Sequence, residues 1–203
     1  MNGKRNFKKL IAENILWRGL YFLTLFLINV IISRYFKASG SGWIYYISNY
    51  FSFVLLIGSF SLETGMAYYG ARKDISFRRL STFSLLWSLA IGSIIVIITG
   101  LLYQEYDMFS FGQIMLFSIA YIPGVLLTTF YCPLFFAKQD FFTPNLILIV
   151  TNIVLILFLA LSIFFDYTSS FIISGYFITF LIQGILLATC FNLNKTFWFR
   201  LSL

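Results

Sequence analysis

The chain has 203 residues, of which 60% are hydrophobic and only 10% are charged, and its mean hydropathy is +0.90. This composition excludes a soluble globular protein of this size and indicates an all-α, polytopic membrane protein. The net charge of +7 does not argue for nucleic acid as a partner, because the basic residues lie beside apolar segments, where they set membrane topology.

Six apolar segments are long enough to cross the bilayer, since a hydrocarbon core of about 30 Å requires roughly 20 helical residues. We therefore predict a six-helix transmembrane bundle that forms a single lobe over residues 1–203. The first segment follows a basic leader and holds Arg18 near its start and Asn29 near its end. The predicted spans are 14–33, 43–69, 80–103, 111–137, 143–165 and 171–191.

The second span, 43–69, contains an acid, Glu63, inside its apolar run. A carboxylate within a lipid-embedded helix costs about 2.5–3.5 kcal/mol, so Glu63 is expected to face protein or water. At 100° per residue, a polar stripe lies within about 60° on this helix and is predicted to point inward; its members are Tyr45, Ser48, Ser52, Ser59 and Glu63.

The fourth span contains two prolines, Pro123 and Pro133. Proline removes a backbone hydrogen bond inside a helix, and membranes tolerate such breaks only where neighbouring groups or water satisfy the freed carbonyls. We expect this helix to be kinked and to border a cavity.

The connections between the spans differ strongly in charge. The N-terminus, the connection after the second span, the one after the fourth and the C-terminal tail hold eleven of the fourteen Lys and Arg, whereas the opposite connections hold Arg34 and Lys37. The positive-inside rule then predicts that both termini are cytoplasmic, in the plasma membrane.

The sequence lacks the residues that most membrane enzymes need. It contains no histidine, which removes His-based acid/base chemistry and the commonest metal ligand. No glycine-rich loop followed by Lys-Ser or Lys-Thr is present for ATP. We therefore expect no enzymatic activity and no cofactor or metal.

A sparse set of polar side chains inside the spans is the pattern expected of a transporter cavity. Each also has a structural interpretation: Arg18 can snorkel to the headgroups, Glu63 can pair with a basic residue, and the amides can bond neighbouring helices. The predicted substrate path consists of Arg18, Asn29, Tyr45, Ser48, Asn49, Ser52, Ser59, Glu63, Asn152 and Gln183. Arg18 and Glu63 are predicted to lie at similar depths, where they could pair.

Three stretches resemble the N-terminal half of polysaccharide flippases, the O-antigen and capsule exporters of the multidrug/oligosaccharidyl-lipid/polysaccharide superfamily. They are the helix start Asn14-Ile15-Leu16-Trp17-Arg18, the small-residue turn RYFKASGSGWIY over 34–45, and SLETGMAYY over 61–69, which is similar to the family's Gly-Leu-Glu-Thr segment but has Ser61 where that segment usually has Gly. Their order and spacing agree over residues 5–80.

This resemblance implies two six-helix lobes, related by an axis along the membrane normal, around a cationic cavity with alternating access. The chain would supply one lobe, and a second six-helix lobe, from a C-terminal half, a second copy or a separate chain, would complete it. The implied activity is the flipping of an undecaprenyl-pyrophosphate-linked oligosaccharide across the bacterial inner membrane for surface polysaccharide or lipopolysaccharide synthesis. Arg18 would meet the pyrophosphate, and the Tyr45, Ser48 and Ser52 face would line the sugar path.

Two other hypotheses remain open from the sequence. One is a cation-coupled multidrug exporter of the same superfamily, in which Glu63 would couple cation entry to drug release. The other is a non-transporting membrane scaffold, such as an assembly partner of a polysaccharide polymerase. Cationic groups facing a cavity favour the flippase, a lone acid favours the exporter, and the absence of a water-filled cavity favours the scaffold.

Overall fold

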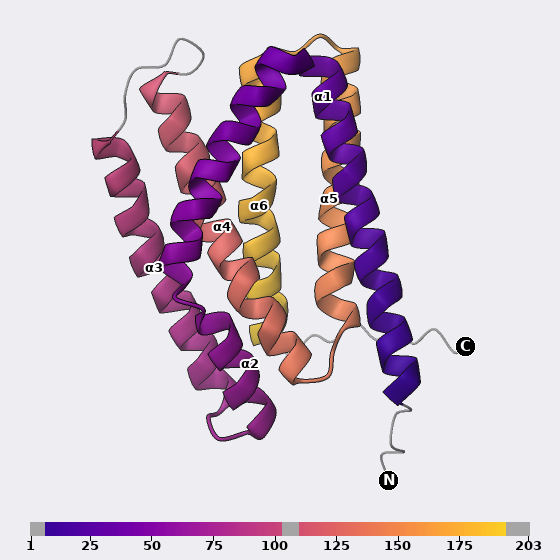
Figure 1. The fold of residues 1–203 in the computed structure, drawn as a ribbon, viewed down its shortest axis with the longest axis vertical. Coiled ribbons are helices and arrows are strands. Elements are labelled where there is room, and N and C mark those ends of the chain that lie inside the picture. Colours follow the sequence, from indigo (N-terminus) through magenta and orange to yellow (C-terminus); the bar gives the residue numbers. More distant parts are fainter. Residues whose placement is uncertain (1–6, 103–109, 194–203) are drawn as a thin grey trace.

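The fold is a bundle of helices, and a computed structural model describes residues 7–102 and 110–193. The connection at 103–109, between the third and fourth predicted spans, lies outside the described residues. Figure 1 shows six helices: α1 (Phe7–Ser59), α2 (Leu62–Arg72), α3 (Phe77–Leu101), α4 (Phe111–Ala137), α5 (Phe142–Phe164) and α6 (Ser169–Asn192).

Helix α1 contains the first predicted span and most of the second. It bends sharply at Lys37, whose φ of 56° lies in the left-handed region, and the Ser41 hydroxyl donates a hydrogen bond to the Lys37 carbonyl at the bend. The two arms, 7–36 and 38–59, run in opposite directions from this point (Figure 1). The connection expected at 34–42 is therefore a tight bend between helices rather than a loop.

The second predicted span does not continue to residue 69, because the helix breaks at Phe60 and Ser61. Both residues have left-handed φ values, 48° and 53°, and α2 begins after them. A helix end leaves carbonyls without partners, and Trp87 of α3 satisfies one of them by donating its indole N–H to the Gly58 carbonyl at 3.2 Å. Glu63 consequently lies in the first turn of α2 rather than deep in a continuous span.

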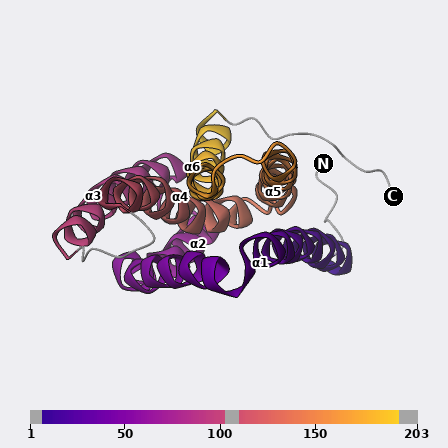
Figure 2. The same ribbon diagram turned by 90° about the horizontal axis from the view of Figure 1, so that it is seen from above.

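Helix α4 is the centre of the bundle. Figure 2 shows α1 and α2 along one side of α4, with α3, α5 and α6 on the other. Phe117, Ile122, Phe130, Tyr131 and Leu134 of α4 are each fully buried or nearly so. The helix continues through Pro123 and Pro133, which are half-buried. Pro123 lies beside Gly92 of α3, which leaves room for its ring.

Helices α4 and α6 approach each other closely at two glycines. A Cβ on Gly184 would lie 2.5 Å from the Gly124 carbonyl oxygen, and a Cβ on Gly124 would overlap the Phe180 backbone. Close backbone approach at small residues is the usual way in which membrane helices associate, because there is no hydrophobic driving force between helices in lipid. The Gly124–Gly184 crossing fixes α6 against the central helix.

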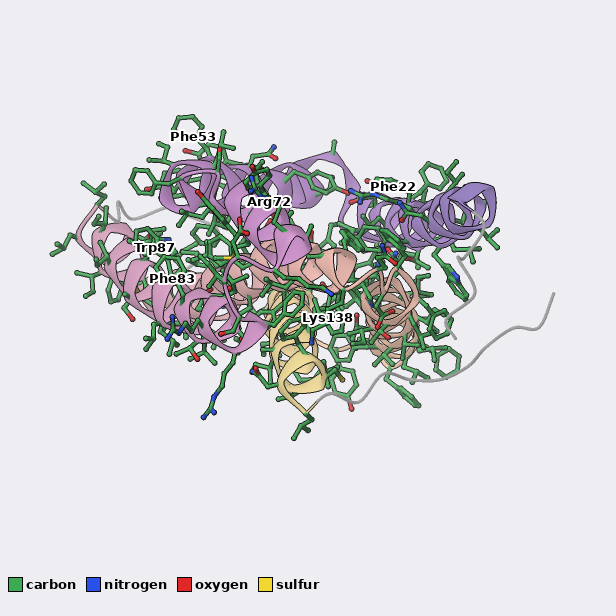
Figure 3. All side chains as sticks on the ribbon, turned by 90° about the horizontal axis from the view of Figure 1, so that it is seen from below. Phe22, Phe53, Arg72, Phe83, Trp87 and Lys138 are labelled. Carbon is green, nitrogen blue, oxygen red and sulfur yellow. The ribbon has the colours of Figure 1, made fainter. Side chains whose placement is uncertain are left out.

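The outside of the bundle is apolar, as expected of a surface in contact with lipid. Phe22 and Phe53 point away from the two arms of α1, as Figure 3 shows, and they are 56% and 64% exposed. Five of the described helices are long and apolar enough to cross a membrane. In α1 the apolar stretch has 46 residues, Asn14–Ser59, and includes the bend. The protein is an all-α polytopic membrane bundle.

Candidate functional site

Each arm of α1 carries polar residues on a helix that is otherwise apolar. Arg18 and Asn29 are eleven residues apart and so lie within about 20° on the first arm. Tyr45, Asn49 and Ser52 lie within about 60° on the second arm. We call these five residues the inter-arm face. Four of its members, Arg18, Asn29, Asn49 and Ser52, are exposed within the described residues, although all lie in apolar helices.

Tyr45 connects the two arms near the bend. Its hydroxyl donates a hydrogen bond to the Asn29 carbonyl at 3.3 Å and lies 3.2 Å from the Ser33 hydroxyl. Both contacts reach from the second arm to the last turns of the first. The tyrosine therefore closes the inter-arm face at the bend, and the arms diverge from there (Figure 1).

Tyrosines from the central helices lie behind the inter-arm face. The Ser52 hydroxyl is 3.0 Å from the Tyr121 hydroxyl of α4, and the Ser48 side chain lies against the Tyr176 hydroxyl of α6. Arg18 is near enough to Cys132 of α4 for its charge to act on the thiol. The face thus combines one cation with amide and hydroxyl groups, which suits a ligand with an anionic group and many hydroxyls.

Asn152 and Gln183 are not part of this face. Asn152 is 2% exposed and donates to the Thr24 hydroxyl at 2.8 Å, and Gln183 donates to the Asn152 carbonyl oxygen at 2.8 Å. Thr24 in turn donates to the Tyr21 carbonyl at 2.7 Å. Their side chains form a buried chain of hydrogen bonds that links α1, α5 and α6. Of the two interpretations open from the sequence, the structure favours helix bonding for these two amides.

Ser59 and Glu63 lie apart from the inter-arm face. Ser59 is buried and donates to the Leu56 carbonyl within its own helix. Glu63 belongs to α2, beyond the break, and its Oε2 atom is buried without a hydrogen-bond partner among the described residues. The predicted continuous stripe from Tyr45 to Glu63 is wrong, because the left-handed residues Phe60 and Ser61 change the helix direction between its last two members.

Arg18 and Glu63 do not form an ion pair in the structure. The first arm of α1 packs against α5, where Trp17 meets Phe142 at 4.9 Å between ring centroids, whereas α2 packs against α4, where Gly70 approaches Ala137. The salt bridge found within the described ranges joins Arg72 and Asp74 at 3.1 Å. Arg18 and Glu63 were predicted to lie at similar depths in the membrane, but a similar depth does not make two residues neighbours across the bundle.

Sequence reasoning missed Tyr121 and Tyr176. Both come from helices that are distant in sequence from α1, and each is one of 13 tyrosines in an aromatic-rich chain. Neither position within its helix indicates a contact with the inter-arm face. That contact arises only from the packing of α4 and α6 against α1. The hydroxyl stripe on the second arm was the one local signal that pointed toward them.

No protein-family model, curated protein or solved structure matches the chain. The functional argument therefore depends on the geometry and chemistry of the residues themselves.

Proposed function

We propose that the chain is one lobe of a transporter that flips lipid-linked oligosaccharide across the bacterial inner membrane. The observation that carries this proposal is the inter-arm face, a set of exposed polar residues on two helices of membrane length. An exposed arginine or asparagine facing hydrocarbon is unfavourable, by about 2.5–3.5 kcal/mol for arginine at the bilayer centre. The face therefore needs water, a ligand or another protein surface beside it.

An undecaprenyl-pyrophosphate-linked glycan has the chemistry that this face would bind. Its pyrophosphate is a bidentate acceptor for the guanidinium of Arg18, which is a strong and geometrically specific pairing. Its sugar hydroxyls match the amides of Asn29 and Asn49 and the hydroxyls of Tyr45 and Ser52. The resemblance at 14–18, 34–45 and 61–69 supports the same assignment.

The distribution of charge supports an orientation with both termini in the cytoplasm. Arg72, Lys73, Arg78, Arg79 and Lys138 lie in or beside the connections at the end of the bundle that carries α2. The bend at the opposite end holds Arg34 and Lys37. Under the positive-inside rule the α2 end is cytoplasmic.

The proposed transporter needs a second six-helix lobe. In transporters built from repeats, the site forms where two lobes rock against each other. Four residues of the inter-arm face are exposed, so a second lobe would have polar groups to contact on this chain. Residues 1–203 alone are therefore expected not to transport.

Glu63 favours a second candidate, the cation-coupled multidrug exporter. A carboxylate oxygen that is buried without a partner is a suitable place for a proton or a metal cation to bind. In that case transport would depend on an ion gradient and on Glu63, and it would not require a pyrophosphate.

Photo-cross-linking tests the proposed substrate. A photoreactive residue at position 49 is expected to capture the lipid-linked glycan in membranes that contain it. The same residue at position 50, which lies about 100° from Asn49 on the same arm and outside the inter-arm face, is expected to capture ordinary phospholipid. Phospholipid adducts at both positions would contradict the proposal. A protein adduct from a polymerase at position 49 would support the scaffold instead.

A further inference from the structure

A pocket opens at the end of the bundle that carries α2, on the side away from the inter-arm face. It has a volume of about 650 Å³ and lies between the start of α3, the end of α6 and the turn after α4. We call it the lower-end pocket. Its lining residues are Phe77, Arg78, Ser81, Thr82, Leu85, Leu86, Lys138, Phe191 and Asn192.

Lys138 contributes a half-buried ammonium group to this pocket. Its Nζ atom lies 3.5 Å from the centroid of the Phe191 ring and 5.2 Å from that of Phe77. No carboxylate of the described ranges lies within salt-bridge distance of it. Burial lowers the pKa of Lys138, and the nearby Asp140 charge opposes this shift. Figure 3 shows Lys138 near the centre of this end of the bundle, so the cation is placed there without a close counter-ion.

Arg78 adds a second cation in an electrostatically unfavourable position. It lies in the first turn of α3, together with Arg79, directly after the N-cap Ser76. The N-terminus of a helix carries a partial positive charge, so a cation there is disfavoured by about 0.3–1 kcal/mol and an anion is favoured. An anion bound in the pocket would offset this repulsion and would pair with Arg78 and Lys138 together.

The remaining walls divide into a polar part and an apolar part. Ser81 donates to the Asn192 carbonyl oxygen at 2.6 Å, and the Asn192 amide makes a long contact of 3.5 Å to Tyr131. An amide has two N–H donors, so one of them remains for a ligand. Leu85 and Leu86 lie eight and nine residues after Phe77, about 12 Å further along α3 at 1.5 Å per residue. The pocket thus runs from a cationic mouth into the apolar depth of the membrane.

We infer that the lower-end pocket binds the phosphate headgroup of an anionic phospholipid, with one acyl chain along Leu85 and Leu86. Two cations and an amide donor match a phosphodiester, and the apolar wall matches a chain that a soluble phosphate lacks. This inference depends on membrane insertion and not on the transported substrate.

Native mass spectrometry of the full chain tests the inference. The protein is purified in detergent with mixtures of phosphatidylglycerol and phosphatidylcholine, and retained lipid per chain is measured. We expect selective retention of phosphatidylglycerol, weakened roughly tenfold in Arg78→Gln and in Lys138→Gln, because each removes a charge-assisted hydrogen bond. Arg79→Gln is the matched control: it removes the same charge from the neighbouring position, which does not line the pocket, and is expected to retain lipid normally.

Arg78 is exposed, so its substitution should not impair folding, and its result decides the test even if Lys138→Gln fails to fold. Unchanged retention of phosphatidylglycerol in Arg78→Gln would overturn the inference. Equal retention of phosphatidylcholine would also overturn it, as would an equal loss in Arg79→Gln. Glycerol phosphate is added in a separate arm. If this soluble compound displaces the lipid at equal concentration, the pocket is a site for free phosphate compounds and the lipid assignment is wrong.

Discussion

Arg18 is the residue on which the proposed chemistry depends most. It is exposed on an apolar helix, it lies on the same side of the first arm as Asn29, and it forms no salt bridge with another described residue. A purely snorkelling arginine would be replaceable by any long polar side chain, whereas an arginine that pairs with pyrophosphate needs its charge and its planar fork.

We predict that Arg18→Gln abolishes restoration of surface polysaccharide in a flippase-deficient strain that also supplies the second lobe. Arg34→Gln is the matched control, because Arg34 is also an exposed arginine of α1 but lies at the bend. The control is expected to restore polysaccharide at equal membrane levels. Restoration by Arg18→Gln to the level of the unchanged chain would show that Arg18 does not bind the substrate.

Glu63 is explained locally by its place in α2. A carboxylate in the first turn of a helix interacts favourably with the N-terminal partial charge, which is worth about 0.3–1 kcal/mol. Its buried, unpartnered Oε2 atom has an opposing cost of about 1–3 kcal/mol or more for a charged group.

We therefore predict that Glu63→Gln leaves thermal stability unchanged or raises it. Because Arg18 and Glu63 lie on elements that pack against different helices, their effects should be independent. In a double-mutant cycle with Arg18→Ala, the unfolding free energies should add within about 0.3–0.5 kcal/mol. A coupling energy of several kcal/mol would mean that the two side chains form the pair that the sequence alone allowed.

At the scale of elements, the crossing of α4 and α6 brings two helix backbones close together. We predict that Gly124→Ala destabilises the protein by about 1–3 kcal/mol, since the added methyl group would overlap the Phe180 backbone, which cannot move aside as a side chain can. Gly112→Ala is the control on the same helix, because no atom lies within 4 Å of its Cβ position. The midpoint of thermal unfolding in detergent measures both. Equal midpoints for the two variants would mean that this crossing does not hold α6.

The all-α class and the presence of long apolar helices could be predicted from the sequence, because both depend on local composition. The helix break at Phe60 and Ser61 could not be predicted, because the run from 43 to 69 is largely apolar and contains no local break signal. The break is stabilised by a contact from another helix, the hydrogen bond that Trp87 of α3 donates to the Gly58 carbonyl. Helix packing also decided the roles of the amides. Asn152 and Asn49 are the same residue type in similar surroundings in the sequence, yet one is buried in a chain of hydrogen bonds and the other is exposed.

At the scale of the whole molecule, the charge distribution predicts the orientation in the membrane. We predict that, in a background without the native cysteines, Ser39→Cys at the bend reacts with a membrane-impermeant thiol reagent added outside the inner membrane, whereas Asp74→Cys between α2 and α3 does not. Both positions are exposed, so access depends on the side of the membrane and not on burial. Labelling of position 74 alone would invert the proposed topology.

The central claim of this account is that the inter-arm face meets a polar path and not lipid. The most direct measurement is the reactivity of Asn49→Cys with a small water-soluble thiol reagent in native membranes, compared with Tyr50→Cys, which lies about 100° away on the same arm and outside the inter-arm face. We predict that position 49 reacts, that lipid-linked oligosaccharide protects it, and that position 50 stays unreactive under both conditions. Equal, unprotected and slow reaction at positions 49 and 50 would show that the inter-arm face meets lipid, and would contradict the account.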